Sequence, residues 1–349
     1  VEQLLIATIE AAVSSNAVKP SEFEKVIVDS TVMEKAIAHP TDSRLMEIAR
    51  YQVVKTAKAS GILLKQTYAK EALQLRRKAG GYAHARQFKR LRKVVKRQRT
   101  ILGIVLREIQ RKLPEGQSES SALQRLAVVM QRAERLRSQK PKDKDKLYAF
   151  HAPEVSCISK GKARKPYEFG VKSSLAITHK QGLIVGARTF PGNPYDGHTL
   201  AAQLEQTRIF LENVGAEPKD VFVDLGYRGV DHQNPRVTIH HRGKHRSMTK
   251  EQRRWLKRRQ SIEPVFGHLK NDHRMDRNWL KGEVGDAIHA VLCAAGYNIR
   301  WLMRAILASI FSPVYLSVAM RHWAQIFKER LSGFLSESTT DSEMHLSLA

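Results

Sequence analysis

Apolar residues recur with two different periods along the chain, and the change of period divides it into sections. Short apolar runs and alternating apolar residues, which are typical of strands, occur before residue 30 and again between residues 167 and 240. Two of the short runs end on an acid, Asp29 and Asp224. The expected strands span 23–29, 167–178, 183–190, 221–224 and 237–240.

Outside these strands the apolar residues recur every three or four positions, which predicts helices. The clearest stripe runs from Leu91 to Leu113, inside a section that is helical from residue 42 to about residue 137. This order of elements predicts an α/β fold whose strand core is interrupted after its first strand by an all-helical insertion over 42–147. The other expected helices span 2–14, 198–214, 249–270 and 286–311.

The charge balance points to a polyanionic partner. Sixty Lys and Arg residues against 34 Asp and Glu give a formal charge of +26, and nucleic acid is the first partner that such a surface suggests. The excess concentrates in the helical insertion, where residues 76–112 hold fourteen Lys or Arg and one acid, Glu108. A second concentration, 242–259, holds nine Lys or Arg and one acid, Glu251.

Four cations of the insertion recur at helical spacing on a face away from the apolar stripe: Arg86, Arg90, Lys93 and Arg97. A solvated helix face usually alternates acids with bases, and this row does not. Unrelieved like charges repel one another. We therefore expect the row, called the basic row below, to contact DNA phosphates.

Several other classes of protein are excluded by composition. The two cysteines, Cys157 and Cys293, lie far apart and have no partner at ligand spacing, which excludes a disulfide scaffold and a zinc ribbon and favours a reducing cytoplasm. No apolar window approaches the roughly 20 uncharged residues of a membrane span. The N-terminus lacks the basic leader of a secretion signal.

Three acids are candidate catalytic residues. Asp29 and Asp224 end strands, where open α/β sheets place their sites, and an ideal helix would put Glu263 within about 40° of Arg259 and Lys270. Three carboxylates without cysteine or a histidine cluster suit Mg²⁺ or Mn²⁺. Two such ions about 4 Å apart support in-line phosphoryl transfer. The predicted class is metal-dependent cutting or joining of nucleic acid.

Each of these features has a simpler alternative. An acid that closes a strand is often a turn former, and Arg259 with Glu263 could be an ordinary i, i+4 salt bridge. Pro264 disfavours α conformation at Glu263 and marks a kink or a fresh helix start. Trp255 could stack on a base, but the core is its expected place.

Seven short motifs occur in order: V-D-S-T-V at 28–32, H-P-T-D-S at 39–43, I-S-K-G-K at 158–162, P-Y-E-F-G at 166–170, G-N-P-Y-D-G-H at 192–198, V-D-L-G-Y-R-G at 223–229 and I-E-P-V-F-G-H-L-K at 262–270. Together they resemble the bacterial insertion-sequence DDE transposases of the insertion-sequence-five type. The resemblance runs from about residue 2 to about residue 308.

The resemblance implies an RNase H-like core whose acid triad, here Asp29, Asp224 and Glu263, binds two Mg²⁺ ions, with Mn²⁺ as a substitute. The family's Y-R-E-K signature places Arg259 and Lys270 as contacts to phosphates at the transposon end. The tyrosine position of that signature is Leu256 in this chain. Asp196, His198 and Asp42 lie in other motifs and are interpreted as residues that order loops.

The resemblance also implies an organisation and partners. Residues 1–24 are expected to be a remnant N-terminal helical segment, 25–311 the catalytic domain with its insertion at 42–147, and 312–349 a C-terminal tail. Family members usually carry an N-terminal region that helps bind the transposon ends, and the short segment beginning at Val1 predicts a truncated copy. The expected partners are transposon ends, target DNA and a second copy of the chain, on the bacterial nucleoid.

Three functions follow as hypotheses. The first is a transposase that exposes 3′-hydroxyls at the ends of its element and joins them to target DNA. The second is a truncated, catalytically silent DNA-binding remnant that occupies those ends. The third is a nuclease for RNA–DNA hybrids, for which the sequence offers no recognition feature and which ranks last.

Overall fold

A mixed β-sheet forms the centre of the protein in a computed structural model that describes residues 1–113, 120–159, 165–310, 317 and 320–328. Within these residues the sheet has six strands. The predicted α/β class is confirmed, as is the predicted hairpin. The strands are β1 (Lys25–Glu34), β2 (Ser156–Ser159), β3 (Tyr167–Thr178), β4 (Ile184–Phe190), β5 (Asp220–Phe222) and β6 (Thr238–His240).

Strand β1 lies in the middle of the sheet, whose order is β2-β3-β1-β5-β6. On one side it pairs antiparallel with β3, and Asp29 lies opposite Leu175. On the other side it pairs parallel with β5, and Ile27 lies opposite Phe222. Strands β2 and β4 pair with successive parts of β3, on the edge away from β1. Because β1 has a neighbour on each side, its apolar run 26–28 is buried, as a central strand requires.

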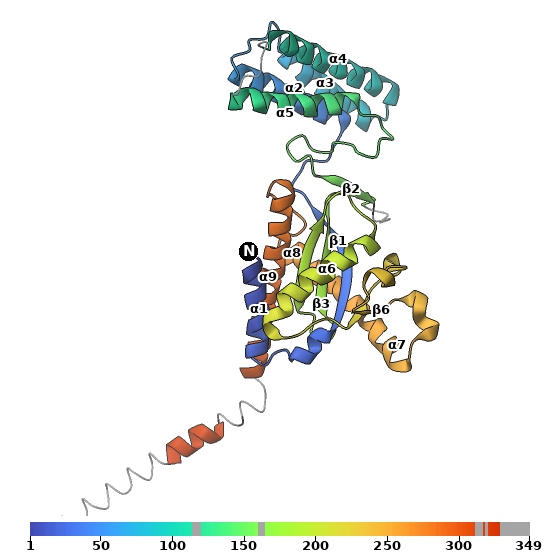
Figure 1. Cartoon of the computed structure of the whole chain (residues 1–349). Coiled ribbons are helices and arrows are strands. Elements are labelled where there is room, and N and C mark those ends of the chain that lie inside the picture. Colours follow the sequence, from blue (N-terminus) through green and yellow to red (C-terminus); the bar gives the residue numbers. More distant parts are fainter. Residues whose placement is uncertain (114–119, 160–164, 311–316, 318–319, 329–349) are drawn as a thin grey trace, which may run out of the picture.

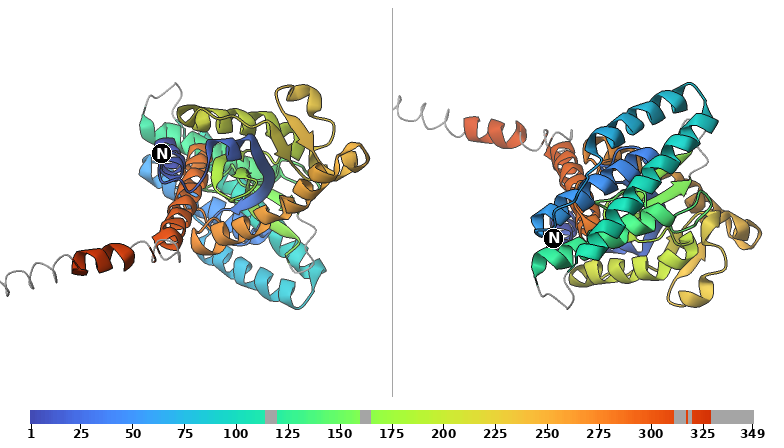
Figure 2. Two further views of the ribbon diagram at one scale, coloured as in Figure 1. Left: turned by 90° about the horizontal axis from the view of Figure 1, so that it is seen from below. Right: turned by 90° about the horizontal axis from the view of Figure 1, so that it is seen from above.

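Five helices pack around or beside the sheet (Figures 1 and 2). Helix α6 packs on β3 and β4, α8 contacts β1, and α9 packs on β4 and on α1. The first helix is part of this core, because Leu5, Ile9 and Ala12 are buried in the same cluster as the sheet residues. The helices are α1 (Glu2–Ser14), α6 (Asp196–Leu211), α7 (Lys250–Lys257), α8 (Ile262–Asp272) and α9 (Gly282–Ile310).

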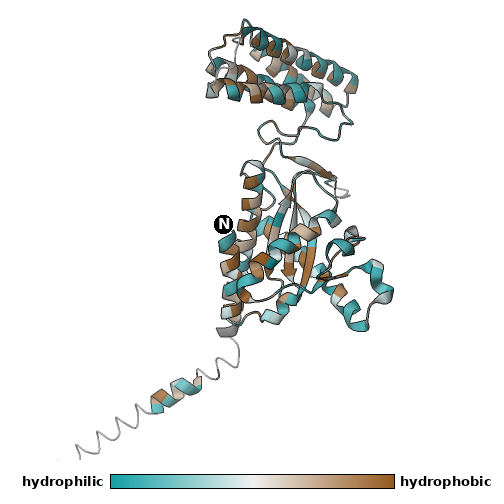
Figure 3. Cartoon of the chain, viewed as in Figure 1, coloured by the Kyte–Doolittle hydropathy of each residue, from teal (hydrophilic) through white to brown (hydrophobic). Residues whose placement is uncertain are grey.

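The section between β1 and β2 folds as a bundle of four helices with its own core (Figure 1). The predicted apolar stripe supplies Leu102, Val105 and Ile109 to this second core, which also takes in Leu45 and Leu126. Each bundle helix carries hydrophobic and hydrophilic residues along its length (Figure 3), as amphipathic helices do. The helices are α2 (Asp42–Ala59), α3 (Ala69–His84), α4 (Phe88–Lys112) and α5 (Ser121–Ser138).

A buried ion network ties the end of β1 to the start of α9, where the chain leaves the sheet for the bundle. Lys35 contacts Asp286 and lies 2.9 Å (Nζ to Oε1) from Glu154, and each of the three side chains is at most 9 % exposed. Asn278 donates to Asp286, and the amide of Gly282 donates to Glu154 at 2.8 Å. Burial raises the pKa of Asp286, whereas hydrogen bonds from Lys35 and two backbone amides leave the pKa of Glu154 lowered despite its burial.

The expected helix over 249–270 is divided into three pieces. Helix α7 ends at Lys257, a 3₁₀ turn follows over Arg258–Ser261, and α8 begins at Ile262. Pro264 lies in the first turn of α8, where its missing amide hydrogen costs nothing, so the expectation of a fresh helix start is confirmed. Trp255 is half-buried against the core, with Lys25 Nζ 4.1 Å from its ring centroid, as expected.

None of the helices in the described part of the chain is long and apolar enough to span a membrane. The predicted tail over 312–349 lies outside the described residues, except for Ser317 and residues 320–328.

Candidate active site

Two of the three predicted catalytic acids lie side by side at the end of the parallel strand pair. Ile27 and Phe222 are paired across β1 and β5, and each acid follows two residues later, Asp29 inside β1 and Asp224 just beyond the end of β5. Asp224 keeps an extended backbone (φ −81°, ψ 173°) beyond the end of β5. Residues two apart on a strand share a face, and paired strands lie about 4.8 Å apart. Asp29 and Asp224 therefore lie level on neighbouring strands and on the same face.

Glu263, the third predicted acid, is linked to Asp29 by the side chain of Arg259. Arg259, in the 3₁₀ turn before α8, places Nη1 2.9 Å from Oδ2 of Asp29 and Nη2 3.9 Å from Oε1 of Glu263. The guanidinium is 12 % exposed and the Glu263 side chain 67 % exposed. The predicted i, i+4 contact thus exists, but the same guanidinium also bridges to the carboxylate of β1.

A polar network that the sequence did not reveal supports the two aspartates. Asp196, at the start of α6, accepts hydrogen bonds from the Ser30 hydroxyl at 2.8 Å and from Lys172 at 2.9 Å. A Cβ on Gly226 would lie 3.1 Å from Asp196 Oδ2. Asp196 therefore joins the residues that follow Asp29 and Asp224, which agrees with a loop-ordering role.

Lys172 and Tyr227 are the site residues that sequence reasoning missed. Lys172 is a buried cation in the middle of β3, and its only sequence signal is that it is the one basic residue of that strand. Tyr227 is buried beside the acids, and burial together with the charges of Asp29 and Asp196 raises the pKa of its hydroxyl. Both side chains hold the local structure rather than face solvent.

Lys270, the other predicted phosphate contact, points toward a different part of the sheet. Its Nζ lies 4.0 Å from Oε2 of Glu168, which is buried near the start of β3. Arg259, in the turn before α8, thus contacts Asp29, whereas Lys270, near the end of α8, is directed toward Glu168 of β3. Their contact with DNA stays a prediction.

Three members of the basic row, Arg90, Lys93 and Arg97, lie on α4, whereas Arg86 lies in the turn between α3 and α4 with a left-handed backbone (φ 54°), so the expectation of four cations on one helix is wrong for Arg86. Arg97 forms an ion pair with Glu71 of α3, with Nε 2.7 Å from Oε1. Arg90 lies 5.9 Å from the ring centroid of Tyr82 and donates to Gln87. The α3 side chains therefore occupy part of this row. Arg86 and Lys93 are exposed.

The donor chemistry of the three acids fits Mg²⁺, but their present positions do not form a finished metal site. Among the described residues no three His, Cys, Asp or Glu side chains are grouped closely enough to hold a metal ion. Carboxylate oxygens are the ligands that Mg²⁺ prefers. One oxygen of Asp29, however, faces a guanidinium, so a divalent cation there requires Arg259 to turn away.

One protein-family model matches part of the chain. Residues 135–299 match the family model described as "Transposase DDE domain". Over this span, which is a little under half of the chain, the protein is similar to the DDE domain of transposases. Asp224 and Glu263 lie inside the matched span, and Asp29 precedes it.

One curated relative aligns with part of the chain. The chain is 49 % identical over 87 residues to "Uncharacterized protein ORF8 in nfe locus" from Rhizobium meliloti, an alignment that covers 25 % of this chain and 42 % of the relative. The chain thus spans less than half the length of that relative. No solved structure matches the chain significantly.

Proposed function

We propose that the protein is the transposase of an insertion sequence of the insertion-sequence-five type, which cleaves DNA at the element's ends and joins the exposed 3′-hydroxyls to target DNA. The observation that carries the proposal is the parallel pairing of Ile27 with Phe222, two residues before Asp29 and Asp224, together with the contacts of Arg259 with both Asp29 and Glu263. The charge of +26 supports DNA as the substrate.

The sheet supports an RNase H-like core. A long central strand, β1, has antiparallel neighbours on one side and short parallel strands, β5 and β6, on the other. The crossover between the two sides passes through α6. This order brings β1 and β5 together although about 200 residues separate Asp29 from Asp224 in the chain. The expectation that Asp29 ends its strand is wrong, because β1 continues to Glu34 while it pairs with β3.

In this proposal the acids of the site hold two Mg²⁺ ions through Asp29, Asp224 and Glu263. Bound there, the ions supply activation of a water or a 3′-hydroxyl and stabilisation of the leaving oxygen. Arg259 then leaves Asp29 for a DNA phosphate, for which its planar guanidinium is suited. Asp196 and Lys172 hold the segment before α6 against Ser30, the residue of β1 that follows Asp29. A second copy of the chain on the DNA, acting at the other end of the element, completes the proposal.

A direct assay tests the function. The purified chain, with Mg²⁺, is incubated with duplex DNA that carries the inverted repeats flanking its gene, and nicked and joined products are separated on denaturing gels. We expect cleavage next to the repeat and joining to a second duplex. Binding without cleavage in both Mg²⁺ and Mn²⁺ would overturn the proposal and leave a DNA-binding remnant.

The proposed movement of Arg259 from the Asp29 carboxylate to a DNA phosphate predicts that replacing Arg259 changes the affinity of the site for metal ions. Replacing Arg259 with Met removes a positive charge beside Asp29, so the affinity for Mn²⁺ in the absence of DNA is expected to rise about fivefold, the equivalent of ~1 kcal/mol for a partly screened ion pair. Mn²⁺ titration followed by electron paramagnetic resonance measures this without any reaction. Arg258→Met is the matched control, because Arg258 donates to the carbonyls of His179 and Lys180. Equal affinity in the two variants would contradict the exchange.

A further inference from the structure

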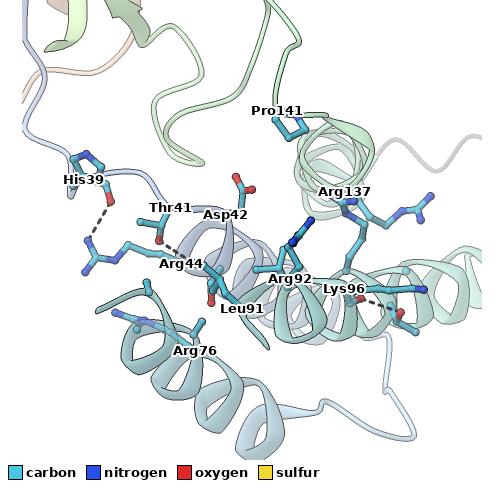
Figure 4. A pocket seen from close by; sticks show the side chains of 18 of the residues that line it. His39, Thr41, Asp42, Arg44, Arg76, Leu91, Arg92, Lys96, Arg137 and Pro141 are labelled. Atoms are coloured by element: carbon cyan, nitrogen blue, oxygen red, sulfur yellow. Dashed lines mark hydrogen bonds between the residues drawn. The ribbon is translucent and has the colours of Figure 1, made fainter. Parts of the chain in front are cut away.

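The helical bundle contains a large hollow that the proposed chemistry does not use. It has a volume of about 1040 Å³ and lies between the start of α2, one side of α3, the middle of α4 and the end of α5 (Figure 4). This is at the upper end of the range for ligand pockets. It is called the bundle groove below.

The bundle groove is strongly cationic. Asp42 is the one acid among the described residues that line it. Figure 4 shows basic side chains from all four helices around the hollow. The cations are Arg44, Arg76, Arg92, Lys96, Arg99, Arg107 and Arg137.

Most of these charges are not neutralised within the protein. Arg137 is paired with Glu134. The other six form no direct ion pair with a carboxylate in the described part of the chain, although Arg107 lies near enough to Glu134 to help Arg137 lower its pKa. Where their side chains donate hydrogen bonds, the acceptors are neutral carbonyls: Arg44 bonds to that of His39, Arg92 to that of Phe88 and Arg99 to that of Gln139. The Nε of Arg99 is buried and lacks any partner among the described groups. The groove thus holds an excess of positive charge that an anionic ligand can satisfy.

Helical geometry separates the groove from the basic row. At about 100° per residue, Arg92, Lys96, Arg99 and Arg107 fall within about 80° of one another on α4. The centre of the basic row lies about 110° further round the same helix. The row is turned toward α3, where Glu71 pairs with Arg97, whereas the groove cations remain available.

The lining between the cations is small and aliphatic. Ala79, Gly80 and Ala83 of α3 face Leu91 and Val95 of α4 across the groove. No Phe, Tyr or Trp is among the described lining residues. Sites for single strands usually stack bases on aromatic rings, so this lining favours a ligand read through its phosphates.

We propose that the bundle groove binds the phosphodiester backbone of duplex DNA, and that it, rather than the basic row, is the main DNA contact of the bundle. The inference rests on the proposed function, because DNA is the polyanion that this function supplies. Contacts of this kind position a protein on DNA without reading sequence. The lining of the groove begins at His39, five residues after β1 ends at Glu34, so the groove follows directly in the chain from the strand that carries Asp29.

The salt dependence of binding tests the proposal. The full chain carrying Arg76→Ala, Arg92→Ala and Lys96→Ala is compared with one carrying Arg86→Ala, Arg90→Ala and Lys93→Ala; all six side chains are exposed and both triples remove three charges. Fluorescence anisotropy with a labelled duplex at a series of NaCl concentrations gives the slope of log K against log salt. Each lost phosphate contact reduces the magnitude of this slope by about 0.9. The slope of the groove triple is therefore expected to fall by about 2.7, and that of the comparison triple by less than about one.

The other outcomes are also decisive. An equal or larger loss in the comparison triple would overturn the proposal and return the contact to the basic row. Tight binding of ATP, lost in the groove triple while the duplex slope stays unchanged, would assign the groove to a free nucleotide instead. Thermal unfolding of both triples checks that the bundle is folded. Because binding is measured without Mg²⁺, failure of the groove proposal is distinguishable from failure of cleavage.

Discussion

Asp29→Asn and Asp224→Asn are each expected to lower the rate of DNA cleavage by at least about 10²-fold, more than the 10- to 100-fold typical of groups that only orient metal ligands. The amide has the shape of the carboxylate but carries no charge and offers one oxygen fewer to a hard cation. Because the two acids lie level on adjacent strands, losing either leaves a site that cannot hold both ions. Single-turnover cleavage of end-containing duplex in Mg²⁺ measures the effect.

Asp231→Asn is the matched control for this pair. Like Asp224, Asp231 comes a few residues after β5, but its carboxylate is exposed and contacts Lys244. We expect cleavage by this variant to stay within about twofold of the unchanged chain, since surface ion pairs contribute little. Affinity for DNA in the absence of metal should be similar in all three variants. Full cleavage by Asp224→Asn would remove that residue from the site.

The second large effect concerns stability. Lys35→Met is expected to lower the free energy of unfolding by about 3–5 kcal/mol, because it leaves two buried carboxylates without their cation. Asp286 and Glu154 are at most 9 % exposed and contact Lys35 directly. Chemical denaturation followed by circular dichroism measures the loss. Lys165→Met is the control: Lys165 pairs with Glu34 but is 53 % exposed, so the loss there should stay below about 1 kcal/mol.

The pH dependence of the Lys35 variant has a definite sign. Burial already raises the pKa of Asp286 in the folded protein, and removing Lys35 raises it further. A group whose folded pKa lies above its unfolded pKa gives its full stability below the unfolded value and loses it as the pH rises through the folded value. The deficit of Lys35→Met should therefore shrink at acid pH. A deficit that grows on acidification would contradict the role of Asp286.

The local patterns in the sequence were sufficient for most of the elements. The hairpin β3–β4 and the apolar stripe of α4 follow from periodicity, because strands and helices present one face to a core at fixed intervals. Strand β2 was not predicted, since four residues give too short a pattern. The break within the expected helix over 249–270 was not predicted, because Arg258 and Arg259 are good helix formers. At the break, Arg258 donates to the carbonyl of His179 in the turn after β3, and Arg259 donates to Asp29 of β1.

By itself the sequence indicated a class of chemistry, from two acids that follow short apolar runs, a third acid in a basic segment, and a large excess of positive charge. These are properties of residue type and local order, and they survive without knowledge of the partners. Only the tertiary structure decided that β1 and β5 are neighbours in the sheet and that the guanidinium of Arg259 pairs with the carboxylate of Asp29. It also decided that α1 packs in the core of the sheet and which face of α4 lines the bundle groove. Those depend on strand register and helix packing between segments far apart in the chain, which no local pattern specifies.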